Sequence, residues 1–193
     1  MIYVDDHIMD FDLQQALKEV SPQRREYALR YRHERDQRLC VAAFRLLHRA
    51  LLHEYDIQEP PLFTIDTKGK PHLQEYPHIH FSLSHCRKAV ACAVSDEPVG
   101  IDIESLDIID EHVAATVMSE KEQQQIASAG HTGVAFYRLW TMKESLYKLT
   151  GDDNCGDICH MLDKMPPVVF ETMVFPHSVC TVCRYNTATS LGS

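Results

Sequence analysis

The chain has 193 residues, of which 45% are hydrophobic and 24% charged, and its formal net charge is −9. This composition is ordinary for a soluble globular protein with a sizeable core. The negative charge argues against a general nucleic-acid binder, and no apolar run approaches the roughly 20 residues that span a bilayer. The N-terminus lacks the basic start and apolar core of a signal peptide, so we expect a cytoplasmic protein with free thiols.

The first half of the chain carries alternating strand and helix signals. A short strand is expected over 2–8 and a helix over 11–20. Ser21-Pro22 is a typical helix start, and we expect one helix to run from there through an arginine-rich stretch. Apolar residues recur there at intervals of three and four, which predicts a core-facing side. These residues are Leu39, Ala42, Ala43, Leu46, Leu47, Ala50 and Leu51.

Positive charge is concentrated in that expected helix, with eight arginines between residues 24 and 49. The concentration favours a local anion site. The alternative is a solvated helix face, whose charge Glu26, Glu34 and Asp36 would offset.

Strand signals dominate the middle and the end of the chain. Residues 62–65 alternate like a strand before the turn 66–69, and three runs suggest a three-stranded meander: 79–83, 89–94 and 99–103. Ser119 with Glu122 forms a capping-box signal, and a longer helix is expected over 134–149. Two further strands are expected over 168–175 and 179–185.

Two carboxylates stand out in the last strand of the meander, Val99-Gly100-Ile101-Asp102-Ile103-Glu104. Residues i and i+2 of a strand point to the same face, so Asp102 and Glu104 should project side by side. Like charges at this spacing favour a bound cation, and carboxylate oxygens suit Mg²⁺. The alternative is a strand that enters a solvent-facing turn.

The expected helix over 134–149 has two distinct faces. Its core stripe consists of Leu139, Met142, Leu146 and Leu149. On the other side, Trp140, Glu144 and Lys148 follow one another at intervals of four. A Glu–Lys pair at this spacing is a common surface feature, but the only Trp of the chain beside it predicts that this face is covered.

Together these segments resemble a known family. Gly100-Ile-Asp102-Ile-Glu104, followed by Trp140-Thr-Met-Lys143-Glu144-Ser-Leu-Tyr-Lys148, resembles the paired signature of the 4′-phosphopantetheinyl transferases of the longer, Sfp-type class. Three further stretches match the family in the same order. They are Ser21-Pro-Gln-Arg24-Arg25-Glu, Thr67-Lys-Gly69-Lys70-Pro71 and Phe81-Ser-Leu-Ser84-His85-Cys86.

The resemblance implies an enzyme that moves the phosphopantetheine arm of coenzyme A to a serine of an apo acyl, polyketide or peptidyl carrier protein. The reaction uses Mg²⁺ and releases adenosine 3′,5′-bisphosphate. By the same resemblance, Asp102, Glu104 and Glu144 hold the metal. Glu144 also takes the serine proton, and Lys148 neutralises the departing phosphate.

Coenzyme A would be held by residues of the first half, again by resemblance. Arg24 and Lys70 match positions that bind the nucleotide and its 3′-phosphate, and His85 matches a phosphate-binding histidine. Arg38 is a further candidate, and Ser84 could contact phosphate or ribose or cap a strand end.

The implied fold is α+β, a pseudo-twofold pair of similar α/β subdomains, 1–98 and 99–193, with the active site between them. The chain is expected to be a monomer without nucleic-acid or membrane partners. It departs from the family over 151–156, where Gly151-Asp-Asp-Asn-Cys155-Gly156 replaces a Gly-x-Gly-Leu segment.

Three other functions remain open at this point. One is a binding-only relative that recognises coenzyme A or the carrier protein without catalysis. A second is a metal-dependent phosphohydrolase. A third is a zinc protein that uses the C-terminal cysteines with His160 as a spare ligand. Cys180 and Cys183 argue against zinc, because residues i and i+3 of a strand point to opposite faces.

Overall fold

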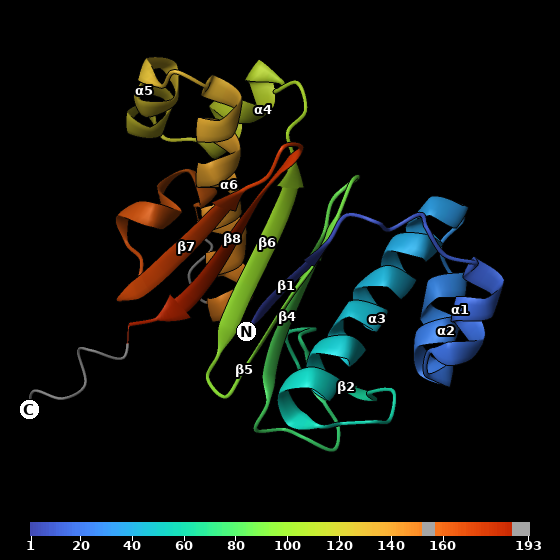
Figure 1. Cartoon of the computed structure of the whole chain (residues 1–193). Helices are drawn as coiled ribbons and strands as arrows, with labels where there is room; N and C mark the ends of the chain where they lie inside the picture. The colour runs from blue at the N-terminus through green and yellow to red at the C-terminus, as the bar shows by residue number, and fades with distance from the viewer. Residues whose placement is uncertain (152–156, 187–193) are drawn as a thin grey trace, which may run out of the picture. The chain divides into compact units, whose positions relative to one another are not determined.

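The computed structural model of the chain describes residues 1–151 and 157–186. They belong to two compact units, Met1–Glu97 and Pro98–Ser193, and each unit combines helices with antiparallel sheet (Figure 1). This mixture agrees with the predicted α+β class. In the part of the chain that is described, no helix is both long and apolar enough to cross a membrane.

The first unit is built on a three-stranded sheet in the order β1-β5-β4, and a separate hairpin pairs β2 with β3. Its helix α3 packs on β5, and every residue of the predicted apolar stripe is buried. The hairpin turn includes Gly69 at φ 84°, a left-handed conformation that glycine adopts without strain. The elements are β1 (Ile2–Asp5), α1 (Leu13–Glu19), α2 (Pro22–Leu29), α3 (Glu34–Tyr55), β2 (Phe63–Ile65), β3 (Pro71–Leu73), β4 (His80–His85) and β5 (Val90–Ser95).

The single helix predicted from Ser21 onward is wrong, because the chain breaks between α2 and α3. The N–H of Arg30 bonds back to the carbonyls of Tyr27 and Ala28, and His33 is extended. The break lets α2 pack against α3, where Arg24 Nη1 lies 3.4 Å from Cys40 Sγ. Tertiary packing therefore overrides a helical pattern that contains no proline or glycine after its first turn.

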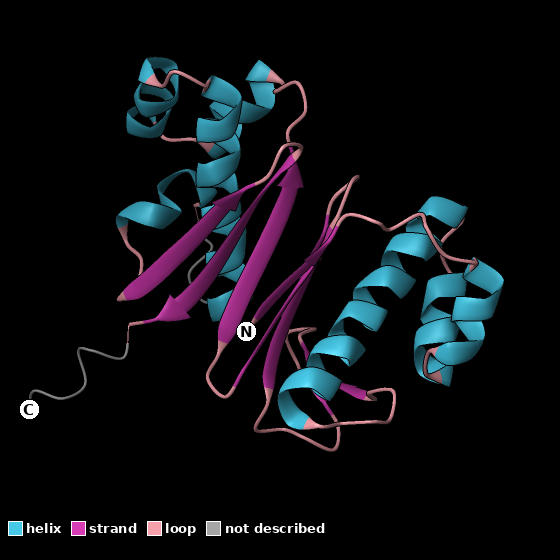
Figure 2. Ribbon diagram, in the orientation of Figure 1, coloured by secondary structure: helices cyan, strands magenta, loops and turns pink. Residues whose placement is uncertain are grey.

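The second unit places helix α6 against a sheet in the order β6-β8-β7 (Figure 2). The predicted meander is wrong in its third strand, since β6 pairs antiparallel with β8, with Asp102 opposite Thr181, while β5 pairs with β1 and β4. The elements are β6 (Val99–Ser105), α4 (Glu111–Val117), α5 (Glu120–Ser128), α6 (Thr132–Thr150), the 3₁₀ helix η2 (Ile158–Asp163), β7 (Val168–Val174) and β8 (Ser178–Tyr185).

The predicted capping box of α5 is present: the Ser119 hydroxyl accepts from the N–H of Glu122, whose carboxylate accepts from the N–H of Ser119. The predicted core stripe of α6 is also largely confirmed, with Leu139, Leu146 and Leu149 buried and Met142 half-buried. Two short elements carry no signal in the sequence: α4, with seven residues, and η2, with six.

Candidate active site

Strand β6 presents its two carboxylates to helix α6, as the alternation of the sequence predicts. Gly100, Asp102 and Glu104 lie on one face and contact residues of α6. Ile101 and Ile103 point to the other face, and both are fully buried. The apolar face therefore fixes the register of the strand, and this register fixes which side the carboxylates occupy.

The helix approaches this strand closely because small residues line the contact. Thr141 and Ser145 are fully buried on α6, and the Thr141 hydroxyl lies 2.7 Å from that of Thr181 on β8. A Cβ atom at Gly100 would collide with the carbonyl oxygen of Ser145 and lie 2.7 Å from the Leu149 nitrogen. The glycine of the β6 motif thus has a packing role that sequence analysis did not assign to it.

Lys148 pairs with Asp102 across this contact. Its Nζ atom lies 2.7 Å from Asp102 Oδ1, and the aspartate is only 3% exposed. A buried carboxylate is costly unless a cation compensates it, so Lys148 stabilises the ionised aspartate. The interaction places a positive charge beside the carboxylates that are predicted to hold a metal.

The only tryptophan of the chain holds the second carboxylate. Trp140 Nε1 donates to Glu104 Oε1 at 3.1 Å, which explains why this ring stands on the polar side of α6. Burial raises the pKa of Glu104 to about 7, and the charge of Asp102 contributes to the same shift. The position of Trp140 on the polar face predicts that the ring is covered, but nothing in the sequence indicates that it donates to Glu104.

Glu144 completes the set one helical turn before Lys148. Burial raises its pKa, and the negative charge of Asp102 raises it further. These three carboxylates offer only oxygen ligands and repel one another, which fits a hard divalent cation such as Mg²⁺. Within residues 1–151 and 157–186, no three His, Cys, Asp or Glu side chains form a ready ligand set for a metal ion, and Asp102 is paired with Lys148 instead. Asp102, Glu104 and Glu144 would therefore have to draw closer together to share one cation.

The raised pKa of Glu104 predicts that stability falls as the pH rises. Between pH 4.5 and about 7 the folded protein keeps a proton that the unfolded chain has lost, so ionisation opposes folding across this window. Between pH 5 and 8, we expect the unfolding free energy of wild type to fall by about 1–2 kcal/mol more than that of Glu104→Gln. This figure is reduced to account for partial solvent screening of Glu104. Urea unfolding at both pH values measures this difference.

Glu171→Gln is the matched control for that experiment, since Glu171 is an exposed carboxylate of the same sheet. This variant should keep the pH dependence of wild type. An equal pH dependence in wild type and Glu104→Gln would contradict the assignment.

The arginines predicted to bind coenzyme A have extensive contacts within the first unit. The Arg24 guanidinium lies 5.2–5.3 Å from the centroids of three aromatic rings, those of Tyr27, Phe44 and Phe63. Arg38 pairs with Glu34 at 2.8 Å and donates to the Phe11 carbonyl at 2.6 Å. Arg24 is therefore surrounded by aromatic rings, and Arg38 ties α3 to the segment before α1.

The remaining candidates of the first unit lie on the hairpin and at the end of β4. Lys70 follows the turn of the hairpin, and its burial lowers its pKa. Asp66 Oδ1 accepts from the backbone N–H groups of Lys68 and Lys70, which fixes this turn. Ser84 and His85 are the last two residues of β4, the serine buried and the histidine exposed. Their assignment to coenzyme A stays a prediction.

The C-terminal cysteines do not form a common ligand set in the described part of the second unit. Cys183 packs with Leu146 and Leu149 of α6, while Cys180, three residues earlier on β8, points to the opposite face. Both thiols are buried. Cys155 and the 152–156 departure from the family lie outside the described residues.

Comparison with known proteins finds phosphopantetheinyl transferases among the relatives of this chain. The family model of the 4′-phosphopantetheinyl transferase superfamily matches residues 98–178. The chain is 37% identical to 4′-phosphopantetheinyl transferase psf-1 of Bacillus pumilus, over 77% of this chain and 65% of the relative. It is 29% identical to 4′-phosphopantetheinyl transferase Sfp of Bacillus subtilis, over 78% of this chain and 68% of the relative. The chain is also 29% identical to 4′-phosphopantetheinyl transferase gsp of Aneurinibacillus migulanus, over 97% of this chain and 84% of the relative.

Proposed function

Because this chain belongs to the 4′-phosphopantetheinyl transferase superfamily, we propose that it transfers the phosphopantetheine group of coenzyme A to a serine of an apo carrier protein. The transfer depends on Mg²⁺ and releases adenosine 3′,5′-bisphosphate. The observation that carries the proposal is the set of Asp102, Glu104, Glu144 and Lys148 between β6 and α6.

The reaction is a displacement at the β-phosphorus of coenzyme A. The serine oxygen forms the new bond to this phosphorus, and the bond from the phosphorus to the bridging pyrophosphate oxygen breaks. The departing bisphosphate keeps the electron pair of that bond. Such transfer needs positioning and charge neutralisation more than covalent participation by the protein.

Glu144 accepts the serine proton in this proposal. Burial brings its pKa closer to neutrality, which suits a group that must take up a proton and release it in each cycle. Asp102 and Glu104, together with Glu144, would hold Mg²⁺, which when bound neutralises charge on the pyrophosphate. Lys148 exchanges its contact with Asp102 for the departing phosphate.

The first unit supplies the coenzyme A contacts in the proposal. Arg24 and Lys70 bind the nucleotide and its 3′-phosphate, His85 binds phosphate, and Arg38 and Ser84 contribute secondary contacts. We further propose a cytoplasmic monomer built from two similar α/β halves. Acyl, polyketide and peptidyl carrier proteins are the partner class.

A mass measurement on the carrier protein tests the function. Wild-type protein, coenzyme A, Mg²⁺ and an apo carrier should yield a carrier heavier by one phosphopantetheine group. A carrier whose acceptor serine is changed to alanine should stay unmodified. Tight binding of coenzyme A without modification of any of several carriers would favour the binding-only alternative.

Replacing Lys148 tests whether its ammonium group stabilises the buried carboxylate of Asp102. We expect Lys148→Met to lower the unfolding free energy by about 2 kcal/mol without divalent cations, because a buried carboxylate loses its cation. Adding Mg²⁺ should then raise the melting temperature of the variant more than that of wild type. Thermal unfolding with and without Mg²⁺ measures both effects, with Lys121→Met as an exposed-lysine control.

If Mg²⁺ shifts wild type and Lys148→Met equally, Lys148 does not share Asp102 with the metal.

A further inference from the structure

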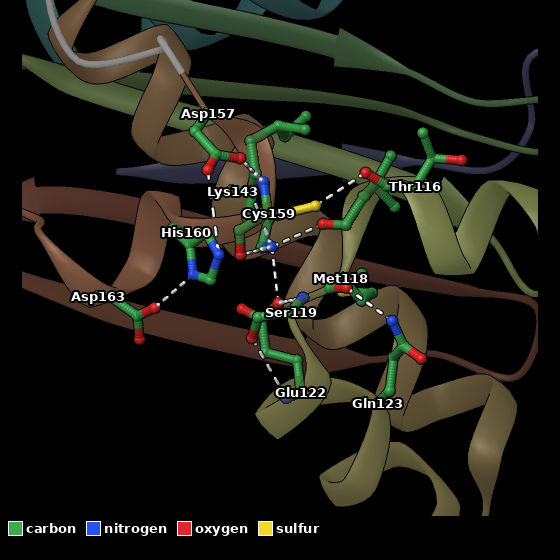
Figure 3. Close-up of polar contacts among 12 residues, drawn as sticks. Thr116, Met118, Ser119, Glu122, Gln123, Lys143, Asp157, Cys159, His160 and Asp163 are labelled. Atoms are coloured by element: carbon green, nitrogen blue, oxygen red, sulfur yellow. Dashed lines mark hydrogen bonds and ion pairs between the residues drawn. The ribbon is translucent and has the colours of Figure 1, made fainter.

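Lys143 is a fully buried ammonium to which the proposed mechanism gives no task. Its Nζ atom lies 2.7 Å from Glu122 Oε2 and 2.7, 2.9 and 3.1 Å from the carbonyl oxygens of Val117, Ile158 and Cys159 (Figure 3). Its three N–H donors are therefore shared among four acceptors. One side chain of α6 thus joins the end of α4, the start of α5 and the helix η2. A buried charge with this many oriented acceptors is a specific contact, because an incomplete set would be costly.

Two of the four acceptors of Lys143, the Val117 carbonyl and the Glu122 carboxylate, hold the backbone on either side of Met118. Its predecessor, Val117, accepts from the ammonium directly. Its successor, Ser119, donates its N–H at 2.8 Å to Glu122 Oε2, the oxygen that also accepts from Lys143. The ammonium therefore fixes the backbone on both sides of Met118, at the junction between α4 and α5.

Met118 in turn supports the tryptophan of the site. It is 1% exposed and forms a core cluster with Phe136 and Leu139, against which the ring of Trp140 packs. The indole N–H of Trp140 donates to Glu104. Lys143 is thus linked to a carboxylate of the candidate site through the backbone around Met118, the core cluster that contains Met118, and Trp140, which packs against that cluster.

We infer that Lys143 is a positioning residue, which holds the Glu104 carboxylate in place through Met118 and Trp140. It touches neither substrate nor metal. The inference rests on the proposed function, because only that function makes Glu104 part of an active site. Whether the positions of Trp140 and Glu104 depend on Lys143 can still be measured without any transfer reaction.

The test removes both charges of the buried pair while keeping the capping box. In Lys143→Met/Glu122→Gln no charged partner is left buried alone, and the glutamine side-chain oxygen can still accept from Ser119. Trp140 is the only tryptophan, so fluorescence reports on this position alone. We expect a red-shifted emission and easier quenching by acrylamide, together with roughly tenfold weaker Mn²⁺ binding by electron paramagnetic resonance, the loss typical of an outer-shell partner.

A second readout separates positioning from general loss of stability. The Mg²⁺ concentration for half-maximal transfer should rise about tenfold, while kcat at saturating Mg²⁺ stays within about threefold of wild type. In a Trp140→Phe background the same double substitution should change Mg²⁺ half-saturation less than about twofold, because the connecting donor is already absent. Lys121→Met should behave as wild type throughout.

Unchanged tryptophan emission and Mn²⁺ binding in the double variant would overturn the inference. It would also be overturned if the double substitution raised the Mg²⁺ half-saturation in the Trp140→Phe background as much as it does in wild type. Failure of the proposed function has a different signature, in which wild type modifies no carrier. In that case the emission change alone decides whether Lys143 positions Trp140.

Discussion

Replacing Glu144 by glutamine should lower the rate of phosphopantetheine transfer by roughly a thousandfold, the scale on which a general base contributes. Glutamine cannot take up the serine proton, and it also removes one negative ligand from the proposed metal site. The fold should remain intact, because the substitution preserves shape and removes a charge whose burial, and whose repulsion by Asp102, raise the pKa of Glu144. Single-turnover kinetics at saturating coenzyme A and Mg²⁺ measure the rate, and circular dichroism measures the fold.

Glu171→Gln again provides the control, an exposed glutamate of β7 changed in the same way. It should transfer at the wild-type rate. Transfer by Glu144→Gln within about threefold of wild type would remove Glu144 from the mechanism.

Gly100→Ala should destabilise the protein by about 3 kcal/mol or more, at the upper end for an overpacked contact. The new methyl group would collide with the backbone of α6 at Ser145 and Leu149, and backbone atoms cannot rotate away. Either α6 moves off β6 or the strand shifts, and both changes separate Glu144 and Lys148 from Asp102. Chemical denaturation should therefore show a lower midpoint, and transfer should fall even where the protein is still folded.

Gly130→Ala is the matched glycine control. A Cβ atom at Gly130 meets nothing within 4 Å, and this residue lies between α5 and α6. It should unfold within about 0.5 kcal/mol of wild type, as surface substitutions usually do. Equal stability of Gly100→Ala and Gly130→Ala would show that α6 does not need the close approach seen at Gly100.

The arrangement of the carboxylates could be predicted because it depends on local periodicity. Alternation in β6 places Asp102 and Glu104 on one face, and helical spacing places Glu144 and Lys148 together. The pairing of these two faces could not be derived from periodicity, since it depends on the β6–β8 register and on the small residues Thr141 and Ser145. Only the family resemblance suggested it.

The misassigned elements share one physical cause, which is competition from contacts distant in sequence. The break between α2 and α3 carries no proline or glycine, and it follows from packing that brings Arg24 to Cys40 and Phe44. Strand β6 leaves the expected meander because β8 supplies its partner. Lys143 entered only as a member of the family signature, and nothing in its spacing indicates four acceptors from three other segments.

Group transfer and hydrolysis differ in the ratio of their products. Adenosine 3′,5′-bisphosphate and modified carrier protein are quantified in the same reaction of wild-type protein with coenzyme A, Mg²⁺ and apo carrier. We expect one bisphosphate to be released for each serine modified, and none when the carrier is left out. Release of bisphosphate without a carrier, or without a matching gain of mass on the carrier, would contradict group transfer and indicate a phosphohydrolase.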